Sequence, residues 1–247
     1  KNTDNLSNLN LQKKEINYIK DQLKKDVEII TINQYSRELI ILKPKDNHDH
    51  YLFLEETRCL GFKVYDQIKK NSSIVIKNLS DGSINTEAFL EGLALSNYNF
   101  NEYKTKKDDI KLHTIFVNSS LEDEKLYEIE KIVEAVKLTR DLVNTPFSHL
   151  KAIDLANEAQ KAGKESGFKT TIFTKNKIES LKMGGLLAVN QGSIDEPTFS
   201  ILEWKPKNYT NKKPIILVGK RIVYDTGGLT LKPTANSMDI MKVDMAG

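Results

Sequence analysis

Residues 215–233 read IILVGKRIVYDTGGLTLKP, and this stretch decides both the fold and the chemistry expected of the chain. Its first four residues are aliphatic, which is typical of a central strand buried on both faces of a sheet. A polar, glycine-containing segment follows, and open α/β sheets place their ligand sites just beyond the carboxyl ends of such strands. Gly227 and Gly228 permit a tight turn beside Asp225. The stretch therefore predicts a site at the end of a central strand.

A second carboxylate, Asp244, lies a short distance further along the chain. If the fold brings Asp225 and Asp244 together, they repel each other unless a cation lies between them. Hard divalent cations prefer such oxygen ligands. Lys220 and Lys232 could compensate charge or polarise a carbonyl group. The residue types alone leave a second interpretation open, in which Asp-Thr-Gly-Gly is a plain turn and Lys-Pro a surface corner.

A phosphate-binding loop is excluded at the same place. That motif requires Gly five residues before Gly219 and Ser or Thr directly after Lys220. The chain has Pro214 and Arg221 at these positions.

The rest of the chain alternates short helices and strands, which predicts an α/β fold. We expect helices at 11–23, 55–69, 86–96, 122–141 and 152–162, the fifth ended by Gly163. Residues 176–179 have capping-box spacing and are expected to open a short sixth helix, closed by Gly184-Gly185. We expect strands at 27–32, 38–42, 73–76, 111–117, 169–173, 186–189, 200–204 and 215–218. The long helix marks the junction of two domains. The predicted organisation is an N-terminal α/β domain at 1–125, a linking helix at 126–141, and the beginning of a second domain at 142–247.

Composition excludes several classes of function. The chain has 247 residues, with 37 Lys and Arg against 34 Asp and Glu, and a net charge of +3 is too small to indicate nucleic-acid binding. No apolar run approaches the ~18 residues of a membrane span, and the first residues do not resemble a signal peptide. Cys59 is the single cysteine, so no internal disulfide can form and a reducing, cytoplasmic setting is expected.

Several ordered motifs resemble the leucyl aminopeptidase (cytosol aminopeptidase) family. The resemblance rests on residues 218–233 with Met238-Asp239, Met241-Lys242 and Asp244-Met245, on RDLVNTP at 140–146, and on MGGLLAVNQGS at 183–193. Residues 91–104 also look like the N-terminal domain of this family.

The resemblance implies a two-domain enzyme in which an α/β domain is joined by a helix to a mixed-sheet metallopeptidase domain. Such enzymes release N-terminal amino acids from peptides with two divalent ions, Zn or Mn, and commonly assemble as homohexamers. Carried over by motif, Lys220 and Asp244 would bind one metal and Asp225 would bridge both. Lys232 would polarise the scissile carbonyl, and Met241 would line the pocket for the first side chain of the substrate.

The sequence departs from the family in three ways. Arg221 follows the predicted ligand Lys220 where the family usually has Gly, and the loop at 233–237 is one residue longer than in many members. The family motif Asn-Thr-Asp-Ala-Glu-Gly-Arg is absent and would normally lie beyond Gly247. That motif supplies an Asp, a bridging Glu and an Arg that holds a catalytic bicarbonate.

The missing motif leads to an expectation about activity. We expect the chain to be truncated within the catalytic domain and inactive alone, while the complete protein is an aminopeptidase. The alternative is a non-catalytic relative or fragment that acts as a binding or assembly module.

Overall fold

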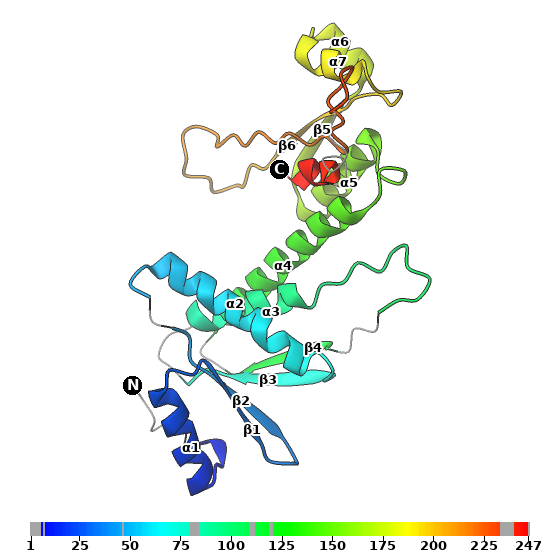
Figure 1. The fold of residues 1–247 in the computed structure, drawn as a ribbon. Helices are drawn as coiled ribbons and strands as arrows, with labels where there is room; N and C mark the ends of the chain where they lie inside the picture. Colours follow the sequence, from blue (N-terminus) through cyan, green and yellow to red (C-terminus); the bar gives the residue numbers. More distant parts are fainter. Residues whose placement is uncertain are drawn as a thin grey trace. The chain divides into compact units, whose positions relative to one another are not determined.

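The computed structural model describes residue 6 and residues 8–45, 47–79, 84–108, 112–118, 121–232 and 240–246, and it confirms the α/β class (Figure 1). The chain forms two compact units, Lys1–Lys137 and Leu138–Gly247. The division falls inside the longest helix, α4, which spans Asp123–Asn144. No helix among the described residues is long and apolar enough to cross a membrane.

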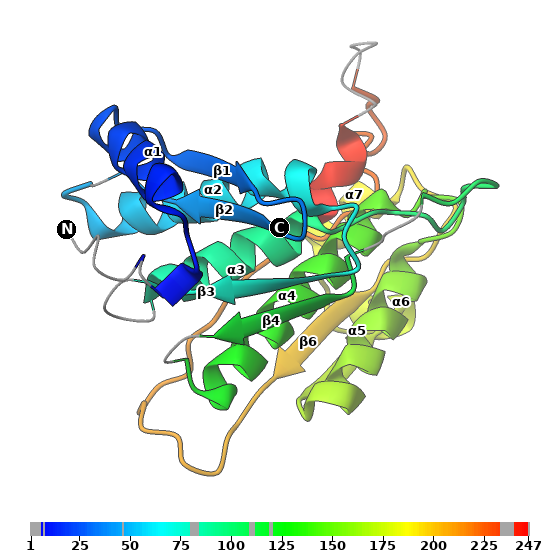
Figure 2. The same cartoon turned by 90° about the horizontal axis from the view of Figure 1, so that it is seen from below.

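The first unit contains two small sheets with helices beside them. Its elements before α4 are α1 (Lys13–Lys24), β1 (Ile29–Asn33), β2 (Glu38–Leu42), α2 (His50–Ile68), β3 (Ser73–Lys77), α3 (Ile84–Ser96) and β4 (Thr114–Asn118). Strands β1 and β2 form an antiparallel hairpin that pairs Ile29 with Leu42. Strands β3 and β4 are parallel and are connected through α3, as a βαβ unit requires (Figure 2).

Two apolar clusters hold this unit together. Ile19 of α1 is fully buried against Ile30 and Ile32 of β1. Helices α2 and α3 pack against the inner face of β3 and β4 through a second cluster, Val64, Ile68, Phe89, Leu93 and Leu112.

Glycines let α2 and α3 approach each other closely. A Cβ atom on Gly92 would lie only 2.1 Å from the carbonyl oxygen of Arg58, so no larger residue fits without moving a helix. The side chain of Arg58 also forms an ion pair with Glu91 of α3, with Nε 2.9 Å from Oε2. Backbone contact and ion pair therefore fix the same helix crossing.

The second unit begins within α4 and carries the predicted site. Its elements are α5 (Ala152–Ser166), β5 (Lys169–Phe173), α6 (Lys175–Ser180), α7 (Gly184–Asn190), β6 (Phe199–Glu203) and the 3-10 helix η3 (Met241–Ala246). Strands β5 and β6 are antiparallel, and the rings of the paired residues Phe173 and Phe199 stack with centroids 6.0 Å apart.

Three local predictions for this unit are wrong. Gly163 does not end the helix that contains it: α5 continues to Ser166, and Gly167 ends it in the left-handed conformation at φ 79°. A buried Gly163 instead allows close contact with Phe168 and Thr170. Residues 186–189 belong to helix α7 and form no strand. The glycines at 184 and 185 begin that helix and do not close α6, whose end is followed by Lys182 at φ 54°.

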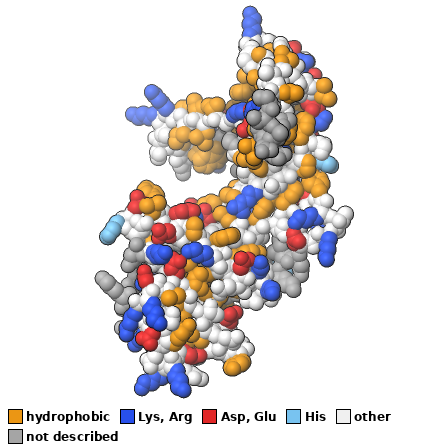
Figure 3. All heavy atoms as spheres, in the orientation of Figure 1, with side chains coloured by type: hydrophobic (Ala, Val, Ile, Leu, Met, Phe, Trp, Pro, Cys, Tyr) orange, Lys and Arg blue, Asp and Glu red, His pale blue; other side chains and the backbone are white. Residues whose placement is uncertain are grey.

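The predicted central strand at 215–218 is also wrong. These residues have no helical or strand assignment and pair with neither strand of the second unit. Their side chains are between 76% and 93% exposed, and Figure 3 shows hydrophobic side chains on the outside of this part of the chain. A strand forms only beside a partner that accepts its hydrogen bonds, and none of the described residues provides one.

Candidate metal centre

Four predicted site residues meet in the second unit. The Lys220 ammonium hydrogen-bonds the Asp225 carboxylate, and its Nζ atom lies 3.1 Å from Oδ2 of Asp244. Lys232 reaches the same group, with Nζ 3.3 Å from Oδ2 of Asp225. The chain therefore brings two carboxylates and two amines to one place from three separate segments.

Buried apolar neighbours hold the two carboxylate-bearing segments together. Val223 lies two residues before Asp225, and Met245 lies directly after Asp244. Both side chains are buried in one cluster with Leu142, Val143, Leu150 and Leu155. The backbone N–H of Asp225 also donates to the carbonyl of Met241 at 3.4 Å. The ends of α4 and η3 and the start of α5 thus form the platform on which the carboxylates lie.

A turn formed by Gly227 and Gly228 brings a backbone N–H group to Asp225. Gly227 and Gly228 have φ values of 100° and 84°, which residues other than glycine rarely adopt. The turn lets the N–H of Gly227 donate to Oδ1 of Asp225 at 3.1 Å. It leaves Oδ2 for the two lysines.

A residue of the earlier glycine-containing motif supports this turn. A Cβ atom on Gly192 would lie 2.5 Å from the carbonyl carbon and oxygen of Gly228. Sequence reasoning included Gly192 in the family-like motif but gave it no role, because a contact between backbones leaves no signal in residue type.

The electrostatics of the centre follow from these contacts. The Lys220 ammonium holds the pKa of Asp225 well below its usual range; desolvation opposes this, and Lys232 and the Gly227 N–H add to it. In turn Asp225, and then Asp244, raise the pKa of Lys220. The repulsion expected between two neighbouring carboxylates is relieved here by an ammonium group that lies between them.

The second lysine and the predicted pocket residue contact each other. Lys232 Nζ lies 3.0 Å from Sδ of Met241, whose side chain is 8% exposed. Arg221, the departure next to Lys220, is exposed to solvent. The loop at 233–237, the predicted lengthening before Asp244, lies outside the described residues.

Sequence reasoning gave no role to Lys242. Its Nζ lies 2.8 Å from the carbonyl oxygen of Leu142 and 2.6 Å from Sδ of Met245, and burial lowers its pKa. A lysine beside the buried Met241 and Met245 of η3 was the available signal.

Among the described residues, no group of three or more His, Cys, Asp and Glu side chains could hold a metal. The donor set at this centre is therefore two carboxylates and an amine. Within His48-Asp49-His50, another pattern that could bind a metal, Asp49 caps α2 by accepting from the N–H groups of Tyr51 and Leu52.

The comparison with known proteins agrees with the motifs. Residues 137–247 match the model of the cytosol aminopeptidase family, catalytic domain. This part of the chain belongs to the cytosol aminopeptidase family. The match includes Lys220, Asp225, Lys232 and Asp244.

Curated relatives carry the same family name. A probable cytosol aminopeptidase from Chlorobaculum parvum is 57% identical over 108 residues, which are 44% of this chain and 21% of the relative. The corresponding protein of Clostridium perfringens is 34% identical over 207 residues, 78% of this chain and 42% of the relative. The chain thus spans well under half of the length of the cytosol aminopeptidases it matches.

Two solved structures share the fold of this chain. The bottromycin maturation enzyme BotP in complex with Mn matches 89% of this chain and 47% of its own, at a TM-score of 0.74 and 24% identity. A tomato leucine aminopeptidase matches 89% and 44%, at a TM-score of 0.73 and 20% identity.

Proposed function

We propose that the chain is part of a metallo-aminopeptidase that releases N-terminal amino acids from peptides. The observation that carries the proposal is the convergence of Lys220, Asp225 and Asp244 with Lys232 beside them. Membership of residues 137–247 in the family supports the reaction class. A Mn ion in the complex of BotP supports divalent ions as cofactors.

The donor set fits a divalent cation. Two carboxylates already share a cation in this structure, the ammonium of Lys220, so the centre is built to hold positive charge. With a metal bound, the neutral amine of Lys220 and the oxygens of Asp225 and Asp244 are the ligands, and we propose two such ions, Zn or Mn. Bound there, divalent ions supply Lewis acidity and lower the pKa of a coordinated water.

The remaining steps fall to side chains of the chain. Lys232 remains charged and stabilises negative charge that grows on the carbonyl oxygen of the scissile amide. Asp225 holds Lys232 at 3.3 Å and so keeps that charge close to the reacting group. Met241 borders the first substrate side chain, and its contact with Lys232 links that pocket to the electrostatic group.

Completion of the centre needs groups that the described residues do not bring to it. The family motif that supplies an Asp, a bridging Glu and the Arg that holds bicarbonate has no counterpart in the sequence. We therefore expect activity from the complete, homohexameric cytoplasmic protein and none from the 247-residue chain alone. The proposed organisation is a domain at 1–125, a linking helix at 126–141 and the beginning of the catalytic domain at 142–247.

One observation favours a second function. Lys220 and Lys232 form ion pairs with the carboxylates of Asp225 and Asp244, and such pairs would equally stabilise a non-catalytic binding or assembly module.

A hydrolysis assay separates the two functions. An aminoacyl 4-nitroanilide and its N-acetylated form are offered, with Mn²⁺ or Zn²⁺, to the 247-residue chain and to a longer protein that carries the Asp-x-Glu-x-Arg motif. We expect turnover only by the longer protein, only of the free-amine substrate, and its loss in Lys232→Met. Turnover by the 247-residue chain contradicts the expectation that it is inactive alone, and an inactive longer protein that binds Mn²⁺ favours the module.

A further inference from the structure

We infer that Lys242 is a positioning residue that fixes the Asp244 carboxylate by tying η3 to the carboxyl end of α4. The inference rests on the proposed function, because it concerns the same metal centre. Lys242 itself does not contact the carboxylates: its amine points to the carbonyl oxygen of Leu142, at 2.8 Å.

The carboxyl end of α4 needs such a partner. The last four carbonyl groups of a helix have no partner within it. Thr145 satisfies the carbonyl of Asp141 with its N–H at 2.8 Å and its hydroxyl at 2.7 Å. The next carbonyl, that of Leu142, accepts from Lys242. A cation at this place is also favoured by the helix dipole.

The contact matters for the site because η3 is short. It spans Met241–Ala246, and a helix of this length has few hydrogen bonds to define its position. The side chains of Met241 and Met245 are buried, but apolar contacts alone do not fix the orientation of a helix. The hydrogen bond from Lys242 to Leu142 is directional and therefore orients η3. Lys242 lies two residues before Asp244.

The Lys242 amine also contacts the apolar cluster that packs beside the centre. Lys242 Nζ lies 2.6 Å from Sδ of Met245, which belongs to the cluster that buries Val223. Both carboxylate segments are thus anchored where α4 ends. Groups that orient metal ligands from outside the coordination sphere change metal affinity by about 10-fold to 100-fold when removed.

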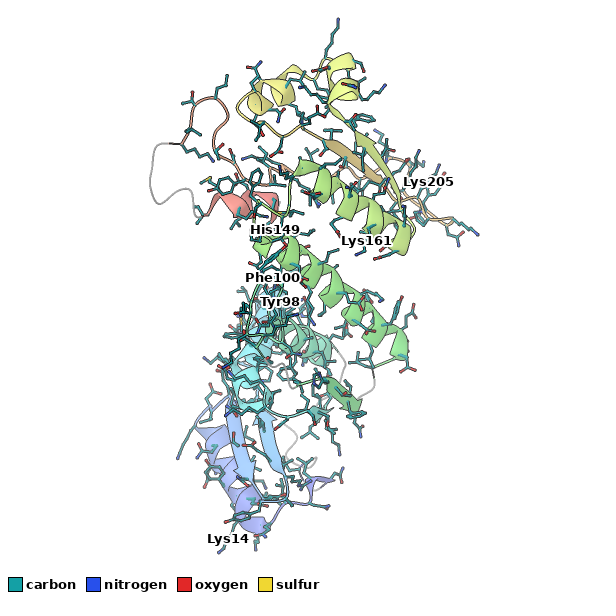
Figure 4. The ribbon with its side chains drawn as sticks, turned by 90° about the vertical axis from the view of Figure 1, so that its right-hand side faces the viewer. Lys14, Tyr98, Phe100, His149, Lys161 and Lys205 are labelled. Carbon is teal, nitrogen blue, oxygen red and sulfur yellow. The ribbon has the colours of Figure 1, made fainter. Side chains whose placement is uncertain are left out.

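The test compares three variants of the 247-residue chain. Lys242→Met removes the hydrogen bond and keeps the bulk, Lys242→Arg keeps a cationic donor, and Lys161→Met makes the same substitution at an exposed position of α5 (Figure 4). Amide hydrogen exchange of residues 241–246 without metal measures how firmly the hydrogen bond of Lys242 holds η3 in place. Mn²⁺ titration followed by electron paramagnetic resonance measures the consequence.

We expect faster exchange of η3 and about 10-fold weaker Mn²⁺ binding or more in Lys242→Met, partial recovery in Lys242→Arg, and no change in Lys161→Met. Circular dichroism checks that α5 and the rest of the unit remain folded. Unchanged exchange, or faster exchange with unchanged Mn²⁺ affinity, overturns the inference. If only the longer protein with the Asp-x-Glu-x-Arg motif binds Mn²⁺, the same variants are compared in that protein. If neither protein binds Mn²⁺, the proposed metal centre fails first, and that result is recognised before any variant is made.

Discussion

Substitution of Gly192 by Ala tests whether the glycine motif before β6 supports the metal-centre turn. The new Cβ would lie 2.5 Å from two backbone atoms of Gly228 and 3.0 Å from the N atom of Leu229. Carbon atoms in contact normally lie about 3.5–4.0 Å apart, so the two backbones must separate by about 1 Å. Overpacking of this kind costs about 1–3 kcal/mol of unfolding free energy.

The strain acts on one segment in particular. The atoms in the way are backbone atoms, so no side chain can rotate to make room. Displacement of Gly228 moves its neighbour Gly227, whose N–H donates to Asp225. We therefore expect Gly192→Ala to lower both the free energy of unfolding and the affinity for Mn²⁺.

Gly185→Ala is the matched control. A Cβ on Gly185 meets nothing within 4 Å, and the residue lies in α7 of the same motif. Ala in a helix is favoured over Gly by about 0.5–1 kcal/mol, so this variant should be slightly more stable. Urea unfolding followed by circular dichroism, with a parallel Mn²⁺ titration, gives both quantities. Equal stability and Mn²⁺ affinity of the two variants would refute the proposed support by Gly192.

Two further predictions concern the first unit. Lys43 lowers the pKa of Asp26 through a 2.6 Å hydrogen bond, so that pair stabilises the fold above the unfolded pKa of about 3.9 and the contribution is lost as the pH falls through the folded pKa. In urea titrations between pH 5 and pH 2, the unfolding free energy of Lys43→Met should therefore fall less than that of the unsubstituted chain. An equal dependence of the unfolding free energy on pH in both proteins contradicts the assignment. Asp49→Ala removes the N-cap of α2 and should cost about 1 kcal/mol in the same assay. Asp66→Ala, at an exposed ion pair, should cost clearly less than Asp49→Ala, and an equal loss in both would count against the cap.

The sequence predicted the elements whose pattern is local. The aliphatic, β-branched and aromatic residues of 38–42 and 169–173 predicted β2 and β5 with the bounds observed, because such residues favour strands. It failed at 186–189, since a short apolar run reads equally as strand or helix. It failed at 215–218 because a strand is a property of a pair, and apolar residues alone provide no partner.

At the site, residue type and motif pointed to Lys220, Asp225, Lys232 and Asp244, which the structure brings together. Charged groups signal chemistry in a sequence, so these four could be named. The contacts of Gly192 and Lys242 could not, because each is made with a backbone atom whose position depends on the tertiary fold.

The exposed aliphatic run at 215–218 has a consequence for behaviour in solution. Unpaired apolar segments pair readily with the same segment of another copy. Here Lys212 and Lys213 precede the run and Lys220 and Arg221 follow it, so two copies that align also bring their cations together. Such flanking charges act as gatekeepers against aggregation. Their repulsion is screened beyond about 8 Å at physiological ionic strength, so added salt favours self-association of the chain. The cations that flank the run thus serve the colloidal stability of the chain.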